Sequence, residues 1–537
     1  MTDIEIPYEK DRHGHYRFFE ILPGTLSFTL LAMPFILSFI NVTVAAVFVL
    51  AYMLIYVVRG FAVAFRGIQA FRVLGSQRKL DWPALLASLQ DGTIPADKKM
   101  PRWHLLTLRR LERQGRQVMP DDIVHAVIIA TYNENREVLE PTIQSVLASR
   151  YNMKQVILMI AYEERGGPEV EQQANALIDE YRGEFLDAMT VRHPSDIPGE
   201  VIGKGGNVTY AGRYLQRYLE EKGIDPIRVP VTTLDADNRP DEQYLAGLSY
   251  VYAACPDPKR VSIQPVTIYT NNIWDAPAPM RVIATGNSFY NIVLSLRPHI
   301  LRNFSAHAQS MASLIDTDFW SVRTIVEDGH QFWRSYFRFD GNYRVLPLYL
   351  PIYQDAVLTD NYRKTLKAQF VQLRRWTYGA SDIAFVADKG FFHKNKVPKF
   401  DLIGKFLRLT EGHVSWAAAP ILVLFAGYIP ALFHPQSYAA NELPLILSRI
   451  QRFAMVGVVV LVFIALKTLP PKPARYKRRR TLWMVLQWVY LPVTTIAYNS
   501  FAAFYSQTRL MFGKYLSKFD VTEKAVVDEA GHAKSKI

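Results

Sequence analysis

The stretch IVHAVIIATYNEN, residues Ile123 to Asn135, decides the fold of the central part of the chain. A short apolar run rich in β-branched residues ends abruptly in polar residues, and VLEPTIQSVLAS follows with apolar residues at helical spacing. This order predicts a buried strand, a polar turn and then a helix.

Two further stretches repeat the pattern. Val156–Ala161 (VILMIA) precedes an acidic loop and a helical segment, and Val229–Leu234 (VPVTTL) ends at the carboxylates of Asp235 and Asp237. Strands that alternate with helices predict an α/β domain, a mostly parallel sheet with helices on both faces. Ligands of such sheets bind beyond the carboxyl ends of the strands, where TYNEN and the two aspartates fall.

Apolar segments flank this domain. Leu26–Val58 contains no charged residue and is long enough for two membrane helices with a break at Asn41. Three more segments of spanning length follow the domain: His413–Phe433, Phe453–Leu469 and Leu482–Phe504. We therefore expect five or six membrane segments, although an odd number would place the basic C-terminal tail opposite the central domain.

Charge and cysteine content indicate the compartment. The net charge of +13 is concentrated beside the apolar segments, as in KPARYKRRR at Lys472–Arg480, and this predicts a cytoplasmic side for these flanks. The single cysteine, Cys255, excludes an intramolecular disulfide. Because the basic residues do not gather on an aromatic-rich face, we expect membrane lipids and no nucleic acid as partners.

The expected organisation places the α/β domain inside a multi-pass membrane protein of the cell membrane. Trp82–Arg116 is basic with leucines at helical spacing, which predicts an amphipathic helix on the membrane surface. The expected parts are a cytoplasmic N-terminal segment (1–22), two transmembrane helices (23–63), an amphipathic linker (64–120), the α/β domain (121–400), a C-terminal membrane domain of three or four helical segments (401–516) and a cytoplasmic tail (517–537).

Several short motifs carry candidate chemistry. Asp235 and Asp237, just past a strand, can address one divalent cation, although the pattern alone favours a solvated acidic turn. Gly203–Asn207 (GKGGN) places Lys204 in flexible backbone that a phosphate can approach, and a plain glycine turn is the alternative.

Two later motifs add an acid and a polar helix face. In TIVEDGHQFW (Thr324–Trp333), Glu327 suits a structural role and Asp328 a general base, while an acidic pair at a helix start is the alternative. In QLRRW, helical spacing puts Gln372, Arg375 and Trp376 on one face, which can bind phosphate and stack on a sugar. Arg374 is expected to point elsewhere, towards lipid headgroups.

This ordered set of motifs, followed by membrane helices, resembles the processive branch of the family 2 glycosyltransferases, which includes the cellulose, chitin and hyaluronan synthases. The resemblance covers about Val124–Ala384 and implies a GT-A type domain. It also implies a role for each matching residue: Thr131, Tyr132, Glu134 and Lys204 at the nucleotide base, Asp235 at the nucleotide, Asp237 with Asp235 at Mg²⁺ or Mn²⁺, Asp328 as catalytic base, and Gln372, Arg375 and Trp376 at the donor diphosphate and the acceptor sugar.

The chain also departs from the family pattern. AYEERGG replaces an aspartate-rich turn, so that Glu163 or Glu164 must substitute there, and Ala130 replaces a proline. In the loop FSAHAQS (Phe304–Ser310), His307 stands where the family has a small residue in its acceptor loop. His307 is therefore an acceptor-binding candidate, with a packed histidine as its default interpretation.

The resemblance implies an inverting, membrane-bound hexosyltransferase that moves a sugar from a nucleotide-sugar donor, with a UDP-sugar favoured, to a growing polysaccharide. The catalytic domain would face the cytoplasm, and the polysaccharide would be secreted through the membrane helices. Transfer of one sugar to a lipid acceptor such as polyprenyl phosphate is the first alternative. A membrane sensor or transporter that binds nucleotide sugars without catalysis is the second.

Overall fold

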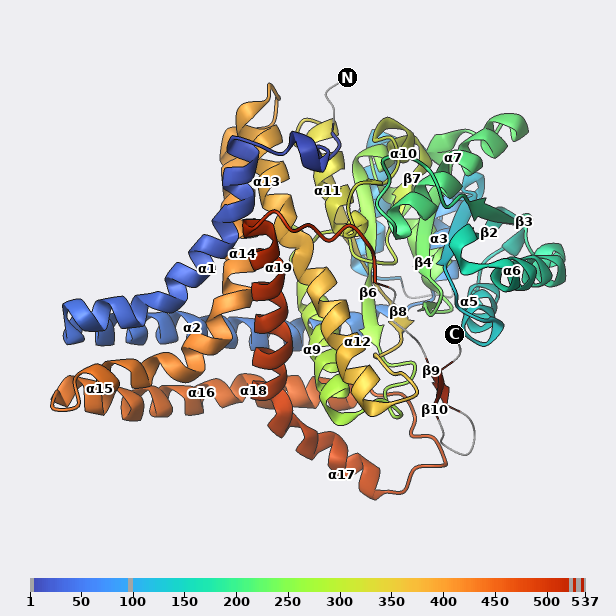
Figure 1. Ribbon diagram of the computed structural model, residues 1–537. Coiled ribbons are helices and arrows are strands. Elements are labelled where there is room, and N and C mark those ends of the chain that lie inside the picture. The colour runs from blue at the N-terminus through green and yellow to red at the C-terminus, as the bar shows by residue number, and fades with distance from the viewer. Residues whose placement is uncertain (1–3, 95–99, 521–524, 528–532, 536–537) are drawn as a thin grey trace.

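The computed structural model describes residues 4–94, 100–520, 525–527 and 533–535. Its centre is a mixed sheet with strand order β3-β2-β1-β4-β7-β6-β8-β5 (Figure 1). The strands are β1 (His125–Thr131), β2 (Val156–Glu163), β3 (Asp187–His193), β4 (Pro230–Asp235), β5 (Arg239–Pro240), β6 (Val261–Tyr269), β7 (Ala308–Ser310) and β8 (Arg344–Gln354). A separate hairpin pairs β9 (Ala525–Val527) with β10 (Ala533–Ser535).

Most neighbouring strands of the sheet are parallel. β1 pairs in parallel with β2 and β4, β2 with β3, and β6 with β8, whereas β7 and β5 pair antiparallel with their neighbours. In register, Ala130 lies opposite Asp235 and Thr131 opposite Tyr162. The carboxyl ends of β1, β2 and β4 therefore meet at one edge of the sheet, which confirms the predicted mixed α/β architecture.

Helices cover both faces of the sheet because side chains alternate along each buried strand. Val127 and Leu158 pack on one face with α5, α6 and α8, while Ile128 and Met159 pack on the other with α7 and α10. The helices of this domain are α5 (Arg136–Leu147), α6 (Pro168–Tyr181), α7 (Lys204–Lys222), α8 (Tyr244–Ala254), α9 (Ala278–Ser295), α10 (Met311–Asp316), α11 (Glu327–Arg338), α12 (Tyr362–Thr377) and α13 (Asp382–Ala387).

The region expected to lie on the membrane surface belongs to this domain instead. α3 (Trp82–Asp91) and α4 (Arg102–Gln114) bury Trp82 and Leu111 in the core beneath the sheet. Arg110 in α4 donates a hydrogen bond to the carbonyl of Ala254 at 2.6 Å. The prediction of an amphipathic surface linker over 64–120 is therefore wrong, because the apolar stripe of these helices faces protein.

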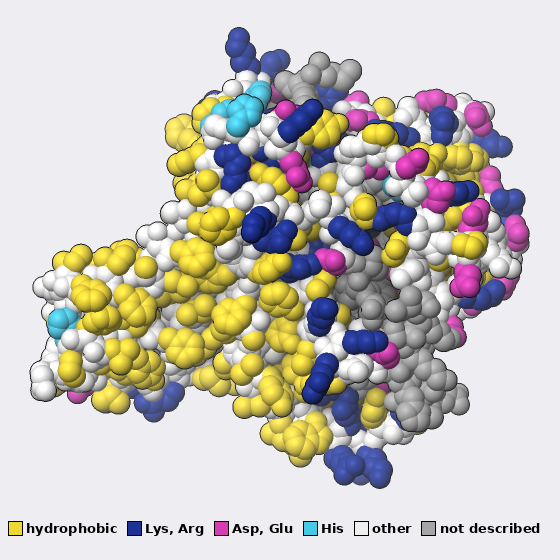
Figure 2. Space-filling model, viewed as in Figure 1, with side chains coloured by type: hydrophobic (Ala, Val, Ile, Leu, Met, Phe, Trp, Pro, Cys, Tyr) yellow, Lys and Arg dark blue, Asp and Glu magenta, His cyan; other side chains and the backbone are white. Residues whose placement is uncertain are grey.

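Within the described residues, four helices are long and apolar enough to cross a membrane: α1 (His15–Ile40), α2 (Val42–Gln77), α14 (Lys399–Phe425) continued by α15 (Ile429–Phe433), and α16 (Tyr438–Thr468). The break between the first two falls at Asn41 as predicted, because its side chain accepts hydrogen bonds from the backbone of Thr43 and Val44 and so caps α2. Both helices extend beyond the expected limits of 23–63. Their apolar side chains, and those of α15, cover the surface at the left of Figure 2.

α2 joins the apolar region to the sheet without interruption. It runs beside α16 and α9, and Gly67 lies directly against the ring of Phe289 in α9. Trp82 follows soon after its end and is buried in the core of the α/β domain. One straight element therefore holds the apolar helices and the sheet in a fixed relation.

The expected crossing over Leu482–Phe504 is helical throughout but is not one regular α-helix. This part of the chain folds as α17 (Arg479–Leu486), α18 (Leu491–Thr494) and α19 (Phe501–Met511), joined by short 3-10 and π turns. α19 runs across the direction of α2 and α16 (Figure 1). The described residues thus contain four candidate spans rather than five or six. Two before and two after the domain would place the domain and the C-terminal tail on the same side, which removes the conflict noted above.

Both chain ends pack against the domain. Glu5 accepts a hydrogen bond from Arg334, and Ile6 is buried. At the other end, the backbone nitrogen of Phe519 donates to the carbonyl of Ile202 at 2.7 Å. Part of the tail expected over 517–537 is therefore ordered against the sheet domain, and 521–524, 528–532 and 536–537 lie outside the described residues.

Candidate functional site

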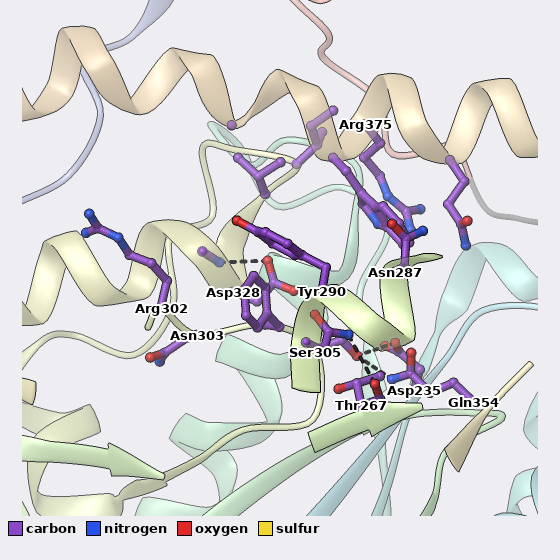
Figure 3. A pocket seen from close by; sticks show the side chains of 18 of the residues that line it. Asp235, Thr267, Asn287, Tyr290, Arg302, Asn303, Ser305, Asp328, Gln354 and Arg375 are labelled. Atoms are coloured by element: carbon purple, nitrogen blue, oxygen red, sulfur yellow. Dashed lines mark hydrogen bonds between the residues drawn. The ribbon is translucent and has the colours of Figure 1, made fainter. Parts of the chain in front are cut away.

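A cavity of about 1340 Å³ opens beyond the carboxyl ends of β1 and β4 (Figure 3). It gathers residues that lie far apart in the sequence. Of the predicted site residues, it is lined by Thr131, Tyr132, Glu134, Lys204, Asp235, Asp237, Asp328, Gln372, Arg375 and Trp376. His307 does not line it.

The loop after β1 is held rigid by Glu134. Its carboxylate accepts hydrogen bonds from the hydroxyl of Thr131 and the backbone nitrogen of Tyr132, both at 2.8 Å. The guanidinium of Arg165, from the loop after β2, lies 5.5 Å from the centre of the Tyr132 ring. Glu134 therefore shapes this wall of the cavity, while the ring of Tyr132 and its cationic neighbour form its surface.

Lys204 and Asp235 form an ion pair inside the cavity. The amine of Lys204, the first residue of α7, lies 2.6 Å from a carboxylate oxygen of Asp235, and the hydroxyl of Ser305 donates to the other oxygen. Burial opposes the charged form of Lys204, but the carboxylates of Asp235, Glu327 and Asp328 outweigh it and raise the pKa of the amine. A cation fixed at the start of a helix favours an anionic ligand there.

The glycines around Lys204 allow the helix to approach its neighbours closely. A Cβ atom on Gly205 would lie 2.4 Å from the carbonyl oxygen of Ser321, a distance that real side chains do not adopt. The GKGGN motif therefore forms the tightly packed first turn of α7 rather than an open loop, and this packing places Lys204 in the cavity.

Asp237 is the second carboxylate of the pair after β4, and its residue is only 8% exposed. One of its oxygens accepts a hydrogen bond from the backbone nitrogen of Asp355 at 3.2 Å. No cluster of three or more His, Cys, Asp or Glu side chains that could hold a metal ion occurs in the described part of the chain. Asp235 and Asp237 nevertheless offer the carboxylate oxygens that Mg²⁺ prefers, and this ion is commonly bound through one or two carboxylates together with substrate phosphates.

Glu327 and Asp328 begin α11 at the far side of Lys204. Asp328 points into the cavity and accepts a hydrogen bond from the backbone nitrogen of Gly329 at 2.7 Å (Figure 3). Burial raises the pKa of Asp328 above its ordinary range, although Lys204 and Arg375 favour its ionised form. Burial, together with the charge of Asp328, raises the pKa of Glu327 to about 8. The pair thus lies in the first turn of a helix and also lines the cavity, and the role of Asp328 as a general base stays a prediction.

Helix α12 forms the opposite wall. Burial lowers the pKa of Arg375, whose guanidinium lies 3.7 Å from the ring centre of Phe519 and donates to the carbonyl of Asp520. The indole of Trp376 lies 6.1 Å from the ring of Tyr269. Arg374 does not face lipid as expected, because it pairs with the carboxylate of Asp520.

The sequence did not identify Ser305, Tyr269 and the C-terminal residues Lys518, Phe519 and Asp520 as parts of this cavity. Phe519 and Asp520 stand in the part of the chain that we expected to be a cytoplasmic tail (517–537). No local pattern in the sequence connects them with the cavity.

His307 does not line the cavity. It is 1% exposed, and one ring nitrogen lies 2.9 Å from the carbonyl oxygen of Phe304. Burial lowers the pKa of His307 to about 4, and the indole of Trp320 donates to its other nitrogen at 3.4 Å. His307 is thus a packed histidine held by hydrogen bonds, which agrees with its default interpretation, and acceptor binding by His307 stays a prediction.

The two glutamates after β2 have different environments. Glu163 lines the cavity, where it accepts hydrogen bonds from Arg165 and lies 3.6 Å from the ring of His193. Glu164 pairs with Arg192 and accepts from the backbone nitrogen of Ser195, outside the cavity. Of the two candidates for the missing aspartate turn, only Glu163 therefore reaches the site.

No protein-family profile and no curated protein sequence matches the chain. Among solved structures, the mannosyltransferase PcManGT from Pyrobaculum calidifontis in complex with GDP-Man and Mn²⁺ is 14% identical with a TM-score of 0.41, covering 75% of this chain and 98% of that one. S. aureus TarS 1–349 in complex with UDP is 9% identical with a TM-score of 0.35, covering 77% of this chain and 96% of that one. TM-scores this low establish neither a shared fold nor a shared activity.

Proposed function

We propose that the protein is a membrane-bound hexosyltransferase that moves a sugar from a nucleotide-sugar donor to an acceptor with inversion. Its domain would be of the GT-A type, in the processive branch of family 2. One observation supports this proposal above all: Lys204, the two aspartates after β4, Asp328 and the polar face of α12 line a single cavity.

The donor would lie between α7 and α12. Thr131 and Tyr132 would border its base, with a UDP-sugar favoured, while Lys204 and Arg375 would face its diphosphate from opposite sides. Both cations are fixed before the ligand arrives, Lys204 by Asp235 and Arg375 by Phe519 and Asp520. Preorganised cations stabilise the charge that develops on a departing diphosphate without rearranging.

Asp237 and Asp235 would hold Mg²⁺ or Mn²⁺, which would supply further positive charge to the diphosphate. Because Lys204 already occupies one oxygen of Asp235, Asp237 is the better ligand of the two. Asp235 would then chiefly orient Lys204 towards the donor.

Asp328 would act as the catalytic base. Its carboxylate would take the proton of an acceptor hydroxyl as that oxygen bonds to the anomeric carbon and the bond from this carbon to the diphosphate breaks. Burial raises the pKa of Asp328 while Lys204 and Arg375 keep the ionised form accessible, which suits a proton acceptor near neutral pH. The proton then rests on Asp328 and the nucleoside diphosphate leaves.

The acceptor would approach from the side of the apolar helices and stack on Trp376, which is paired with Tyr269. A growing polysaccharide is the proposed acceptor, and its chain would pass between the membrane helices at the cytoplasmic face of the cell membrane. A lipid acceptor is the second candidate, supported by the arginines described in the next subsection. A sensor without catalysis is disfavoured, because the base and the carboxylates line the same cavity.

The proposal is tested by nucleotide release from the full chain in lipid nanodiscs across UDP- and GDP-sugars, with Mg²⁺ or Mn²⁺. Asp328→Asn and Glu327→Gln form a matched pair, since the two residues are adjacent and both line the cavity, Glu327 buried and Asp328 half-buried. We expect one preferred donor, a loss of about 10²- to 10⁴-fold in Asp328→Asn, and a much smaller loss in Glu327→Gln, because burial raises the pKa of Glu327 and a glutamine resembles its protonated form.

Full release by Asp328→Asn would disprove its role as the base. If no donor releases nucleotide although the same nucleotides bind tightly, the protein is a sensor rather than a transferase. The mass of the product would separate a polymer from a single transferred sugar.

A further inference from the structure

The cavity continues past Asp328 into a second part that borders the apolar helices. Figure 3 shows Arg302 and Asn303 on one side of Asp328 and Asp235 on the other. This part is lined by Arg59 and Arg66 of α2, Arg297 and Arg302 after α9, and Arg408 of α14. Three separate elements thus bring guanidinium groups to one end of the cavity.

Most of this positive charge has no direct ion-pair partner. Arg59 pairs with Glu411, while Asp382 lies 2.7 Å from the ring of His330 and favours the charged form of Arg302 from a longer distance. Within the described residues, no ion pair reaches the remaining arginines, which we call the arginine cluster: Arg66, Arg297, Arg302 and Arg408.

The environment of the arginine cluster favours an added anion. Burial lowers the pKa of Arg297, and the charges of Arg66 and Arg408 lower it further. Burial also lowers the pKa of Arg302 to about 10. Nε of Arg297 and one terminal nitrogen of Arg302 are buried without a hydrogen-bond acceptor among the described residues. Leaving such groups unsatisfied is costly, and phosphate oxygens are the acceptors that match guanidinium geometry.

The position of the arginine cluster identifies the source of such a phosphate. The uncharged run of α2 ends at Val58, just before Arg59, and that of α14 starts just after Glu411. The pair Arg59–Glu411 therefore marks where charged residues first enter the two apolar helices, and Phe61 and Phe65 of α2 carry exposed apolar surface beyond it. Arg66 and Arg408 lie on the domain side of this pair, at the level where lipid phosphates meet water.

We propose that the arginine cluster binds the phosphate of a lipid-linked acceptor, and that this acceptor presents a hydroxyl to Asp328. This inference rests on the proposed sugar transfer and, of its two acceptor candidates, favours the one that is linked to a lipid. The transferred sugar gains a bond to the acceptor hydroxyl, the proton of this hydroxyl passes to Asp328, and the lipid phosphate remains unchanged in the arginine cluster. A phosphate on a soluble molecule has the same chemistry but does not require a site at this level.

Binding can be measured without turnover by the thermal stabilisation of the full chain in phosphatidylcholine nanodiscs. The probes are farnesyl phosphate, farnesol and inorganic phosphate at equal concentration. The test variant is Arg297→Gln with Arg408→Gln. Arg72→Gln is its matched control, because Arg72 lies on α2, is exposed and does not line the cavity.

We expect farnesyl phosphate to stabilise the wild type and Arg72→Gln, and to bind the double variant about tenfold more weakly or worse. Farnesol should give no shift. Replacing both residues with lysine keeps the charge and should restore part of the binding, which separates lost recognition from a damaged fold.

Equal stabilisation of the double variant, or none in the wild type, would overturn the proposal. An equal shift with inorganic phosphate would overturn the lipid source. If farnesyl phosphate binds as expected but no donor releases nucleotide, the proposed sugar transfer is disproved, while the proposed phosphate site in the arginine cluster is supported.

Discussion

The two ends of the cavity treat charge in opposite ways. One end of the cavity is lined by Lys204, and we call it the donor end because we propose that the donor binds there. The amine of Lys204 faces the carboxylates of Asp235, Glu327 and Asp328. At the membrane end, no ion pair reaches the arginine cluster among the described residues, and Asp382 favours the charged form of Arg302 only from a longer distance. Oppositely charged side chains attract and so keep each other in position. Like charges repel, so the rest of the fold must hold them together, and an anionic ligand would stabilise them.

Of the changes that test this difference between the two ends, removal of Lys204 should have the largest effect on nucleotide release. Lys204→Gln leaves the carboxylates of the donor end without their cation, and we expect nucleotide release to fall by about 10²- to 10³-fold. The loss of the ion pair should also destabilise the fold by about 1.5–3 kcal/mol, towards the lower value because the side chain of Asp235 is 34% exposed. Steady-state kinetics and thermal unfolding measure the two effects.

Lys222→Gln is the control for this substitution, because Lys222 ends the same helix and is exposed. A Lys204→Gln protein with unchanged activity would show that the donor diphosphate does not meet this amine.

The second-largest effect should be the pH dependence of sugar transfer, which depends on the ionisation of Asp328 at the donor end. Because Asp328 must be ionised to accept a proton and burial raises its pKa, activity should fall on the acidic side at a pH above the ordinary range for aspartate. Below that point the rate should drop about tenfold per pH unit. A pH profile of kcat/KM measures this, and a profile that stays flat down to pH ~4 would exclude Asp328 as the base.

At the membrane end, the sign of the stability change should reverse. Arg297→Gln removes one of several like charges and a buried nitrogen without an acceptor, so we expect the Tm in the absence of ligand to stay the same or rise. The gain should be about 1 kcal/mol at most. Thermal unfolding in nanodiscs that lack anionic lipid measures it, and a clear loss of stability would show that Arg297 is a structural residue.

Ionic strength should give the smallest effect. The arginine cluster lies beside water at the apolar boundary, so salt should weaken binding of farnesyl phosphate by several-fold between about 0.05 and 0.5 M. Binding of the donor nucleotide, measured in the same nanodiscs, should change less because its cations are enclosed. Equal salt dependence at both ends would remove the distinction between them.

The donor end was largely predictable from the sequence, while the membrane end was not. The apolar runs of β1, β2 and β4 finish in polar residues, and a parallel sheet brings such ends together, so that Thr131 and Asp235 meet. The arginine cluster combines single residues of α2, α14 and the loop after α9, and no local pattern connects them.

Other differences also have physical causes. Leu482–Phe504 has the composition of a span, but Pro492 and the turns around it divide the helix, and only packing shows that α19 crosses the others. β7 is three residues long, too short to display an alternation that would have shown His307 to be buried. The position of Asp520 at the cavity follows only from its contacts with Arg374 and Arg375 in the structure.

Because α2 is one continuous helix, its length sets the distance between the apolar helices and the α/β domain. At about 1.5 Å per residue, its 36 residues measure about 54 Å from Asn41 to the edge of the α/β domain. The height of the cavity above the apolar boundary is thus fixed by residue count, as is the direction in which Arg66 points. Removing one residue between Arg59 and Arg66 would turn everything beyond it by about 100° and shorten the reach by about 1.5 Å. The length of this segment should therefore tolerate change far less than its side chains do.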